Sequence, residues 1–472
     1  MTSIATILNQ NPLHSKIFKL SGKISSKINI PSYVVGGYVR DALLNRPTND
    51  IDIMVEGDVI KFSNELAKSL NVKKVVEFPE FCTVLIPFSK INIQVASARK
   101  ESYVEKSRKP EVKPCTIEED LSRRDFTINA MAACLMKENY GEIYDPFSGI
   151  KDLQKKILLT PLDPDTTFKD DPLRILRGVR FTAQLNFKLT SFTEDSITKQ
   201  KKGLEFISKE RITEELIKIL KTDKPSIAFY LLKKLDLFPL VFPEIDILGG
   251  VDIIDGKGHK DVFHHTLEVV DNAAKLSKKM EIRFAALVHD IAKPQTKKFY
   301  KDRGWTYYGH EELGQYIIKR AAKRMKISNQ LRDYLMLLTK LHLRPIALAK
   351  EGVSDSAVRR VMIEAGEHID DLMILCRADI TTKNSRKVKE YISNFDRVEK
   401  MIQDVTLRDE MRNFKNPITG EMIMKEFDLK PSREIGEIKD QIKDAIIDGL
   451  IPNNFDDAFN FMIKIKNKKI KD

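Results

Sequence analysis

Strand-like and helix-like patterns alternate through about the first 150 residues of the chain. The apolar run Tyr33–Val35 predicts a buried strand, and Tyr38–Leu44 predicts a short helix that ends before Pro47. Further strands are predicted over Ile51–Val55, Thr83–Pro87 and Ile91–Val95. This part of the chain is therefore expected to form a small unit of mixed helix and strand.

From about residue 151 onward, apolar residues recur at steps of three and four, which places them on one face of an α-helix. One set consists of Leu173, Leu176, Val179 and Ala183, and a second of Ile212, Leu216, Ile219 and Leu220. A third set, Ile435, Ile438, Ile442 and Ile446, predicts an apolar stripe along a final helix. The rest of the chain is therefore expected to be helical, with breaks at Leu248–Gly250 and Pro417–Gly420.

Composition limits the domain count, the partner and the compartment. At 472 residues the chain is too long for one hydrophobic core, and we expect about three domains. Lys and Arg total 80 against 68 Asp and Glu, a net charge of +12 that suits a polyanionic partner. The four cysteines lack Cys-x-x-Cys spacing, and no uncharged run reaches the roughly 18–20 residues that cross a bilayer. A soluble, cytoplasmic protein without a membrane partner is therefore expected.

The stretch from Gly36 to Asp52 carries the first candidate chemical groups. Gly36-Gly37 allows a tight turn that brings the backbone close to phosphate oxygens, and Arg40 adds a fixed positive charge. Asp50 and Asp52 point to the same face of a strand, so they could share a pair of hard cations. Either feature alone is common, whereas the combination is typical of a site for a nucleoside triphosphate and metal ions.

A second set of candidate groups lies between Thr116 and Asp125. Thr116 and Glu119 form a capping box, which predicts the start of a helix. In Arg123-Arg124-Asp125 a guanidinium could grip phosphate while the acid accepts a ribose hydroxyl. Taken alone, the same residues would also fit an exposed, salt-bridged helix end.

With these motifs the chain resembles the class II tRNA nucleotidyltransferases and their bacterial poly(A) polymerase relatives, in the polymerase β superfamily. The resemblance rests on Gly-Gly-x-x-Arg-Asp (36–41), Asp-x-Asp (50–52) and Arg-Arg-Asp-Phe-Thr-Ile-Asn-Ala (123–130). Later segments are similar to the family's linker, base-selecting helix and neck motif, namely Asp145–Leu153, Asp170–Phe181 and Ser208–Leu216. About half of the chain is covered in this way.

The resemblance implies an α+β protein, with a small polymerase-β-like nucleotidyltransferase head followed by an all-α neck, an HD-type body and a tail. The expected bounds are 1–155 for the head, 156–245 for the helical neck with the base-selecting helix, 246–400 for the HD-type helical domain and 401–472 for a helical RNA-binding tail. In that tail, Lys425, Lys430 and Arg433 could contact RNA phosphates.

The resemblance also implies roles for individual residues. Asp50 and Asp52 would be catalytic and would bind Mg²⁺. The implied nucleotide-binding residues are Gly36, Gly37, Arg40, Arg124, Asp125, Asp171, Arg174, Arg177 and Arg180. Among them Asp171 and Arg174 would read the base edge, because an acid and a guanidinium together can distinguish C and A from U and G. For Arg180 an ion pair to Glu214 or Glu215 is the alternative.

Two positions depart from the family pattern. The family usually has Glu-Asp at the start of the base-selecting helix, where this chain has Asp170-Asp171. Polymerases of the superfamily often use a third acid from a neighbouring strand, where this chain has Gln94. Metal binding in the head would then depend on two carboxylates and the triphosphate.

Histidines predict a second site, since six of the eight fall between residues 259 and 342. A His-Asp pair at the end of a helix, with a distant His and Asp, makes a pocket of nitrogen and oxygen donors for a divalent metal. The arrangement resembles the HD phosphohydrolase superfamily, whose ligands match His265, His289, Asp290 and Asp379, with His310 and His342 available for a second metal. The alternative is a metal-free relic that only shapes the body.

The family resemblance implies template-independent addition of CCA to the 3′ end of tRNA, with CTP and ATP as substrates and two metal ions in the head. A relative that adds only A or only CC, or a poly(A) polymerase, is the nearest alternative. An alternative of another class is a metal phosphohydrolase that acts through the HD site on 2′,3′-cyclic or 2′-phosphate ends, with the head as an RNA-binding module. The intact Asp50-x-Asp52 argues against an inactive head.

Overall fold

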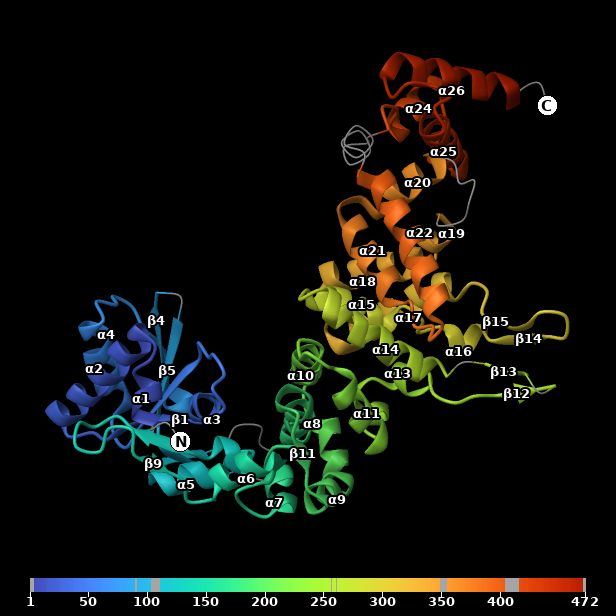
Figure 1. Ribbon diagram of the computed structural model, residues 1–472. Helices are drawn as coiled ribbons and strands as arrows, with labels where there is room; N and C mark the ends of the chain where they lie inside the picture. Colours follow the sequence, from blue (N-terminus) through green and yellow to red (C-terminus); the bar gives the residue numbers. More distant parts are fainter. Residues whose placement is uncertain are drawn as a thin grey trace. The chain divides into compact units, whose positions relative to one another are not determined.

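The computed structural model describes residues 4–89, 91–102, 111–255, 257–259, 261–348, 355–403 and 416–469. The chain divides into two compact units, Met1–Val241 and Phe242–Asp472. The first contains a large sheet and the second is built almost wholly of helices (Figure 1). Among the described helices, none is both long and apolar enough to span a bilayer.

A seven-stranded sheet in the order β3-β4-β5-β2-β1-β8-β9 forms the centre of the first unit (Figure 1). Its strands are β1 (Ser32–Val35), β2 (Ile51–Val55), β3 (Val76–Phe78), β4 (Thr83–Phe88), β5 (Ile91–Ser97), β8 (Ala132–Cys134) and β9 (Ile143–Tyr144). Within it β2 and β5 pair in parallel, with Asp52 beside Gln94, whereas the other neighbouring strands are antiparallel. The strands predicted from apolar runs are confirmed to within three residues at their ends.

Helices and short elements complete this sheet-containing part. They are α1 (Ile4–Leu8), α2 (Pro12–Ile28), α3 (Gly37–Leu43), α4 (Val59–Ser69), η1 (Pro79–Phe81), β6 (Arg99–Ser102), β7 (Glu111–Pro114), α5 (Ile117–Ser122) and η2 (Thr127–Asn129). The predicted capping box is confirmed, because Thr116 accepts from the Glu119 backbone and Glu119 caps the Thr116 backbone in return. Helix α3 likewise occupies the position predicted for a short helix before Pro47.

A helical layer follows in the same unit. It comprises α6 (Gly149–Lys155), α7 (Pro164–Asp170), α8 (Leu173–Leu185), α9 (Ser191–Gln200), η3 (Lys201–Phe206), α10 (Lys209–Leu220), α11 (Ser226–Lys234) and α12 (Phe238–Val241), with the short strands β10 (Ile157–Leu158) and β11 (Lys188–Leu189). Helices α10 and α11 pack on α8, and the apolar faces predicted for α8 and α10 are buried.

Close packing joins α8 to the segment that follows α5. The rings of Phe126 and Phe181 meet edge to face at 5.8 Å. A Cβ atom on Gly178 would lie 2.8 Å from the Phe126 ring, so only glycine admits this contact without displacement. The sequence of α8 therefore brings its arginine-bearing face against the segment that follows the Arg-Arg-Asp motif.

The second unit contains α13 (Pro243–Asp246), α14 (Val262–Leu276), α15 (Met280–Val288), α16 (Lys293–Thr296), α17 (His310–Met325), α18 (Asn329–Leu341), α19 (Arg344–Leu348), α20 (Asp355–Ala365), η4 (Gly366–His368), α21 (Ile369–Ala378) and α22 (Ser385–Gln403). Two small hairpins, β12 (Ile253–Ile254) with β13 (Lys257–Gly258) and β14 (Lys298–Tyr300) with β15 (Gly304–Thr306), interrupt the helices. These hairpins were not predicted from the sequence, because strands of two or three residues are too short to leave a periodic pattern.

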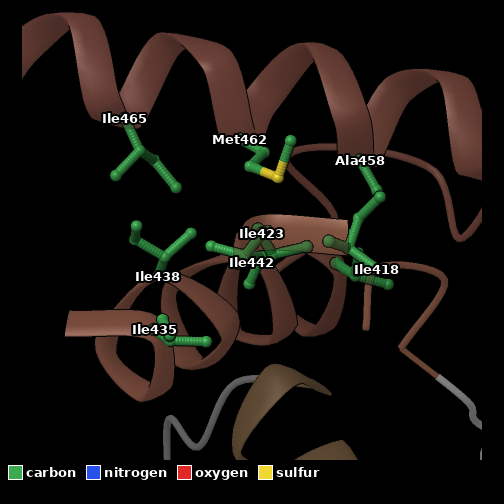
Figure 2. Packing of buried hydrophobic residues seen from close by; sticks show 9 residues of the cluster. Ile418, Ile423, Ile435, Ile438, Ile442, Ala458, Met462 and Ile465 are labelled. Atoms are coloured by element: carbon green, nitrogen blue, oxygen red, sulfur yellow. The ribbon is translucent and has the colours of Figure 1, made fainter. Parts of the chain in front are cut away.

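The last helices form a cluster of their own, consisting of α24 (Gly420–Phe427), α25 (Arg433–Ile447) and α26 (Phe455–Lys469). The predicted stripe on α25 is confirmed, since Ile435, Ile438, Ile442 and Ile446 are all buried. Figure 2 shows Met462 and Ile465 of α26 facing Ile438 and Ile442 of α25. The stripe exists because α25 must bury one face against α26.

Candidate functional sites

A cavity of about 610 Å³ opens in the first unit, between the sheet and α8. Its lining includes every residue for which the sequence predicts a catalytic or nucleotide-binding role: Asp50, Asp52, Gly36, Gly37, Arg40, Arg124, Asp125, Asp171, Arg174, Arg177 and Arg180. It also includes Arg123, the other arginine of the Arg-Arg-Asp motif, and Asp41, Thr48, Asn129, Arg211 and Lys218, for which no role was predicted. Residues separated by more than a hundred positions therefore share one space.

Gly36 has to be glycine because of its backbone angle and its neighbour. It caps α3 with a φ of 69°, and a Cβ atom there would lie 2.6 Å from Nη1 of Arg124. Arg124 is in turn oriented by the buried Asp120, whose Oδ2 accepts from Nε and Nη2 at 3.4 and 3.2 Å. A phosphate group could therefore lie beside the α3 N-terminus, between the Gly36-Gly37 turn and the guanidinium of Arg124.

Asp50 and Asp52 lie at the start of β2, where Asp52 is half-buried and Asp50 is exposed. Burial raises the pKa of Asp52, Arg124 lowers it, and the neighbouring charge of Asp50 raises it again. A cation between the two carboxylates would relieve their repulsion. The strand register places Gln94 beside Asp52, so an amide occupies the neighbouring position on β5.

An ion pair between the buried Asp125 and the half-buried Arg177 holds α8 to the sheet side of the cavity. Arg177 donates from Nε to Oδ2 at 2.7 Å, and its Nη2 lies 2.6 Å from the same oxygen. Oδ1 accepts from the Asn129 side chain and the Phe126 backbone, each at 2.9 Å. Burial alone would raise the pKa of Asp125, but Arg177 and these donors lower it to about 2. Both oxygens of the carboxylate are thus engaged within the protein.

Arg40 is buried and fully engaged. It donates to both carboxylate oxygens of Asp41 at 2.9 and 2.8 Å, and to Oδ1 of Asn129 at 2.7 Å. Asn129 therefore connects Arg40 to the carboxylate of Asp125. Both Asp41 and Asn129 belong to motifs recognised in the sequence, although no role was predicted for either.

Arginines also surround the ring of Phe181. The guanidinium carbons of Arg40, Arg177 and Arg180 lie 5.3, 5.7 and 4.2 Å from its centroid. Arg180 pairs with the buried Glu215 at 2.7 Å, so the alternative predicted for this arginine is what the structure contains. The ring and Glu215 together stabilise positive charge at the base of the cavity.

Asp171 and Arg174 lie where α7 ends and α8 begins. Oδ1 of Asp171 accepts from the Leu173 backbone at 3.1 Å, and Oδ2 pairs with Arg211 at 3.1 Å. Arg174 donates to the Thr167 carbonyl at 3.2 Å. Both side chains remain partly exposed in the cavity. Arg211 was missed, although it stands within the neck motif, which was the available signal.

The second unit assembles the predicted histidine site. One group of possible metal ligands is His265, His289 and Asp379, and another is Asp290, His310 and His342. Asp290 joins the two groups, since Oδ2 lies 3.1 Å from His289 Nε2 and Oδ1 lies 3.3 Å from His310 Nε2. All six predicted residues therefore converge around one carboxylate that could bridge two cations.

The outward-facing nitrogens of these histidines are fixed by hydrogen bonds. Nδ1 of His289, His310 and His342 donates to the carbonyl oxygens of Ala286, Tyr307 and Thr339 at 2.9, 2.7 and 2.6 Å. Nδ1 of His265 bonds Oγ1 of Thr381 at 3.0 Å. A carbonyl can only accept, so the first three rings donate from Nδ1 and turn Nε2 toward the cluster. In the neutral ring Nε2 carries the lone pair that binds a metal, the arrangement expected of metal ligands.

Charges in the cluster also fit a cation. Burial lowers the pKa of His342 to about 4, which keeps that imidazole neutral. Burial acts the same way on His289, but Asp290 and Asp379 raise its pKa to about 10. The two carboxylates thus stabilise positive charge between them, which a divalent cation would supply in place of the proton. Lys293, which was not predicted, adds a charge 2.6 Å from Asp290.

Comparison with known proteins yields three family models: the poly A polymerase head domain over residues 32–159, the probable RNA and SrmB-binding site of polymerase A over 186–248, and the HD domain over 262–384. A multifunctional CCA protein of Shewanella frigidimarina is 32% identical over 376 residues, 76% of this chain and 86% of that protein. An A-adding tRNA nucleotidyltransferase of Aquifex aeolicus is 45% identical over 163 residues, 34% of this chain but 19% of that protein.

Solved structures share the fold at lower identity. The Bacillus stearothermophilus CCA-adding enzyme in complex with CTP matches with a TM-score of 0.68 and 19% identity, over 98% of this chain and 99% of that one. The α+β architecture expected from the sequence is therefore confirmed.

The Asp125–Arg177 pair makes stability depend on pH. Because the pKa of Asp125 falls from 3.8 to about 2 on folding, ionisation stabilises the fold above pH 3.8. This contribution, about 2 kcal/mol, is lost as the pH falls toward 2. Asp125→Asn should therefore be less stable than the wild type near neutral pH, and the difference should shrink in acid, as measured by urea unfolding with circular dichroism. The exposed Asp195→Asn is the matched control. A stability difference that stays constant with pH would contradict this assignment.

Proposed function

Because the chain belongs to the multifunctional CCA protein family, we propose that it rebuilds the 3′-terminal CCA of tRNA from CTP and ATP without a nucleic-acid template. The observation that carries the proposal is the shared cavity, in which the acids of β2 and the Asp171–Arg174 end of α8 line one space. A site that only transfers nucleotides needs the first group. A site that also selects them needs the second.

Head and HD domains depend on divalent metals, and we propose Mg²⁺ at Asp50 and Asp52. Bound there, the metal would activate the tRNA 3′ hydroxyl and stabilise the departing pyrophosphate. Arg124 and the backbone at Gly36–Gly37 bind the triphosphate. Arg40 and Asn129, which are engaged within the protein, position these groups.

Base selection is assigned to Asp171 and Arg174. The carboxylate accepts from the exocyclic amino group that C and A carry, and the guanidinium donates to the adjacent ring nitrogen. Arg211 holds the Asp171 carboxylate in place through the 3.1 Å ion pair. U and G present the reverse pattern, a carbonyl acceptor beside a ring N–H donor, so they are rejected.

RNA binding by the last helices is part of the same proposal. Lys425 lies in α24, Lys430 follows that helix, and Arg433 begins α25. The side chain of Arg433 is 95% exposed and pairs with Glu437 at 3.3 Å. We assign these cations to phosphate contacts with tRNA.

Addition of A alone is a second candidate, because the Aquifex aeolicus relative is an A-adding enzyme and is more similar over its 163 residues than the multifunctional CCA protein is overall. That similarity covers only 19% of the Aquifex protein. The substrate that the enzyme extends separates the two candidates, since an A-adding enzyme requires a tRNA that already ends in CC.

We expect the full chain to extend tRNA that ends at the discriminator base, adding C, C and A in order when CTP and ATP are supplied. Asp52→Ala should reduce extension by about 10³-fold or more, because it removes a proposed metal ligand. Sequencing of the 3′ ends measures both results. Glu77→Ala, an exposed acid on the same sheet, should behave as wild type. Extension only of tRNA ending in CC would favour A addition instead.

We further propose that the HD-type site is a metal phosphohydrolase for 2′,3′-cyclic or 2′-phosphate ends of RNA or nucleotides. The two ligand groups joined by Asp290 support this, because paired cations can hold a phosphate ester and generate the attacking hydroxide. The proposed ligands are His265, His289, Asp290 and Asp379, with His310 and His342 for the second cation.

His265→Ala should lose bound metal and at least about 100-fold of phosphate-ester hydrolysis while keeping tRNA extension, because it removes a ligand remote in sequence from the head. Metal analysis and a phosphate-release assay on the full chain measure these effects. His264→Ala is the matched control, since that neighbouring side chain is 65% exposed. Wild-type protein without metal or hydrolytic activity would refute the proposal.

A further inference from the structure

A cavity of about 690 Å³ lies beside the HD-type ligands in the second unit. His265 and Asp379 line it on the side of the proposed metals, whereas Trp305, Tyr307 and His259 line it with aromatic rings. Lys293 also lines it. The volume is in the range of pockets for small ligands, roughly 300–1,000 Å³. This cavity is therefore large enough to hold more than the phosphate group that the metals would bind.

The aromatic part is built by the β14–β15 hairpin and the segment after β13. Trp305 lies on β15 and is half-buried, and Tyr307 follows two residues later. The ring of His259 meets the indole edge to face at 5.1 Å and 76°. His259 Nε2 accepts from the Asp252 backbone at 3.0 Å, which fixes the orientation of the ring. These contacts stabilise an indole surface that is still partly open to the cavity.

Lys293 connects the aromatic part to the metal ligands. Its Nζ lies 2.6 Å from Oδ2 of Asp290 and 5.5 Å from the centroid of the Tyr307 ring. Lys297 lies over the Trp305 ring at 5.5 Å. Cations between aromatic rings and a carboxylate cluster suit a ligand with an aromatic group at one end and phosphate at the other.

We propose that Trp305 selects among the ligands of this cavity by stacking on the base of a nucleotide, at an RNA 3′ end or free in solution, whose phosphate lies at Lys293 and the HD-type ligands. The proposal rests on the proposed hydrolytic function of that site, because the metals would hold the same phosphate. It adds that the base, and not only the phosphate, determines which esters bind.

A purely structural role for Trp305 is the competing explanation. The indole also contacts Phe299 on the partner strand, with ring centroids 5.2 Å apart. In that case Trp305 would only join the two strands of the hairpin, and ligands with and without a base would bind alike. The two explanations therefore differ in what the base contributes.

The chain itself supplies a direct reporter, since Trp305 is its single tryptophan. We expect adenosine 2′-monophosphate to quench the tryptophan fluorescence of the full-length protein, because a stacked base contacts the indole. Ribose 2-phosphate, which has the same phosphate but no base, should leave the fluorescence unchanged. Equal effects of the two compounds, or no effect of either, would overturn the proposal.

Hydrolysis kinetics give a second, independent readout. Trp305→Ala should raise KM for adenosine 2′-monophosphate by about ten-fold or more, with kcat and metal content unchanged, because stacking on an aromatic ring contributes mainly to binding. KM for ribose 2-phosphate should stay the same. Tyr308→Ala, two residues after β15 and at a side chain that is 70% exposed, is the matched control. An equal rise in KM for both substrates would indicate a structural role and overturn the proposal.

Failure of the hydrolytic function would look different. If the wild type hydrolyses neither ester but adenosine 2′-monophosphate alone quenches the fluorescence, the nucleotide-binding cavity is supported and the phosphohydrolase is refuted. If both esters are hydrolysed with equal kcat/KM and neither quenches, the phosphohydrolase is supported and base recognition is refuted.

Discussion

The ion pair between the buried Asp125 and the half-buried Arg177 is the interaction on which the head site depends. It joins the segment after α5 to α8, and Phe126 packs against Gly178 and Phe181 beside it. Together these contacts set the distance between the carboxylates of β2 and the Asp171–Arg174 end of α8. Removing Arg177 would leave the Asp125 carboxylate buried without its partner, which costs more than the pair itself contributes.

The HD-type site is also organised around a buried carboxylate, but the partners of this carboxylate are histidines and not arginines. A buried carboxylate again holds together groups from distant helices, since Asp290 faces His265 and His289 with one oxygen and His310 with the other. In the head, arginines neutralise the buried acids, which leaves a cavity suited to anions. In the second unit, histidines with fixed outward nitrogens surround the acid, which leaves a site suited to cations. Together the two sites would bind and process the same kind of ligand, a nucleotide.

Much of this could be predicted from the sequence because the informative patterns are local. The strands β2 and β5, the capping box at Thr116 and the apolar face of α25 each follow from a few adjacent residues. Apart from Glu215 for Arg180, the polar partners of the cavity side chains could not be predicted, because they depend on which segments meet in space. The hydrogen-bonded Arg40 and Asn129 are separated by 89 positions, and the ion-paired Asp171 and Arg211 by 40. No role was predicted for Trp305, because the strands of its hairpin are too short to show a periodic pattern in the sequence.

In the proposed function one cavity both transfers the nucleotide and selects it. This can be tested by measuring kcat/KM for CTP, ATP, UTP and GTP on a tRNA primer with the wild type and with Asp171→Ala. We expect the variant still to extend the primer, while its preference for CTP and ATP over UTP and GTP falls by about ten-fold or more. A variant that loses activity equally with all four nucleotides, at unchanged preference, would contradict it.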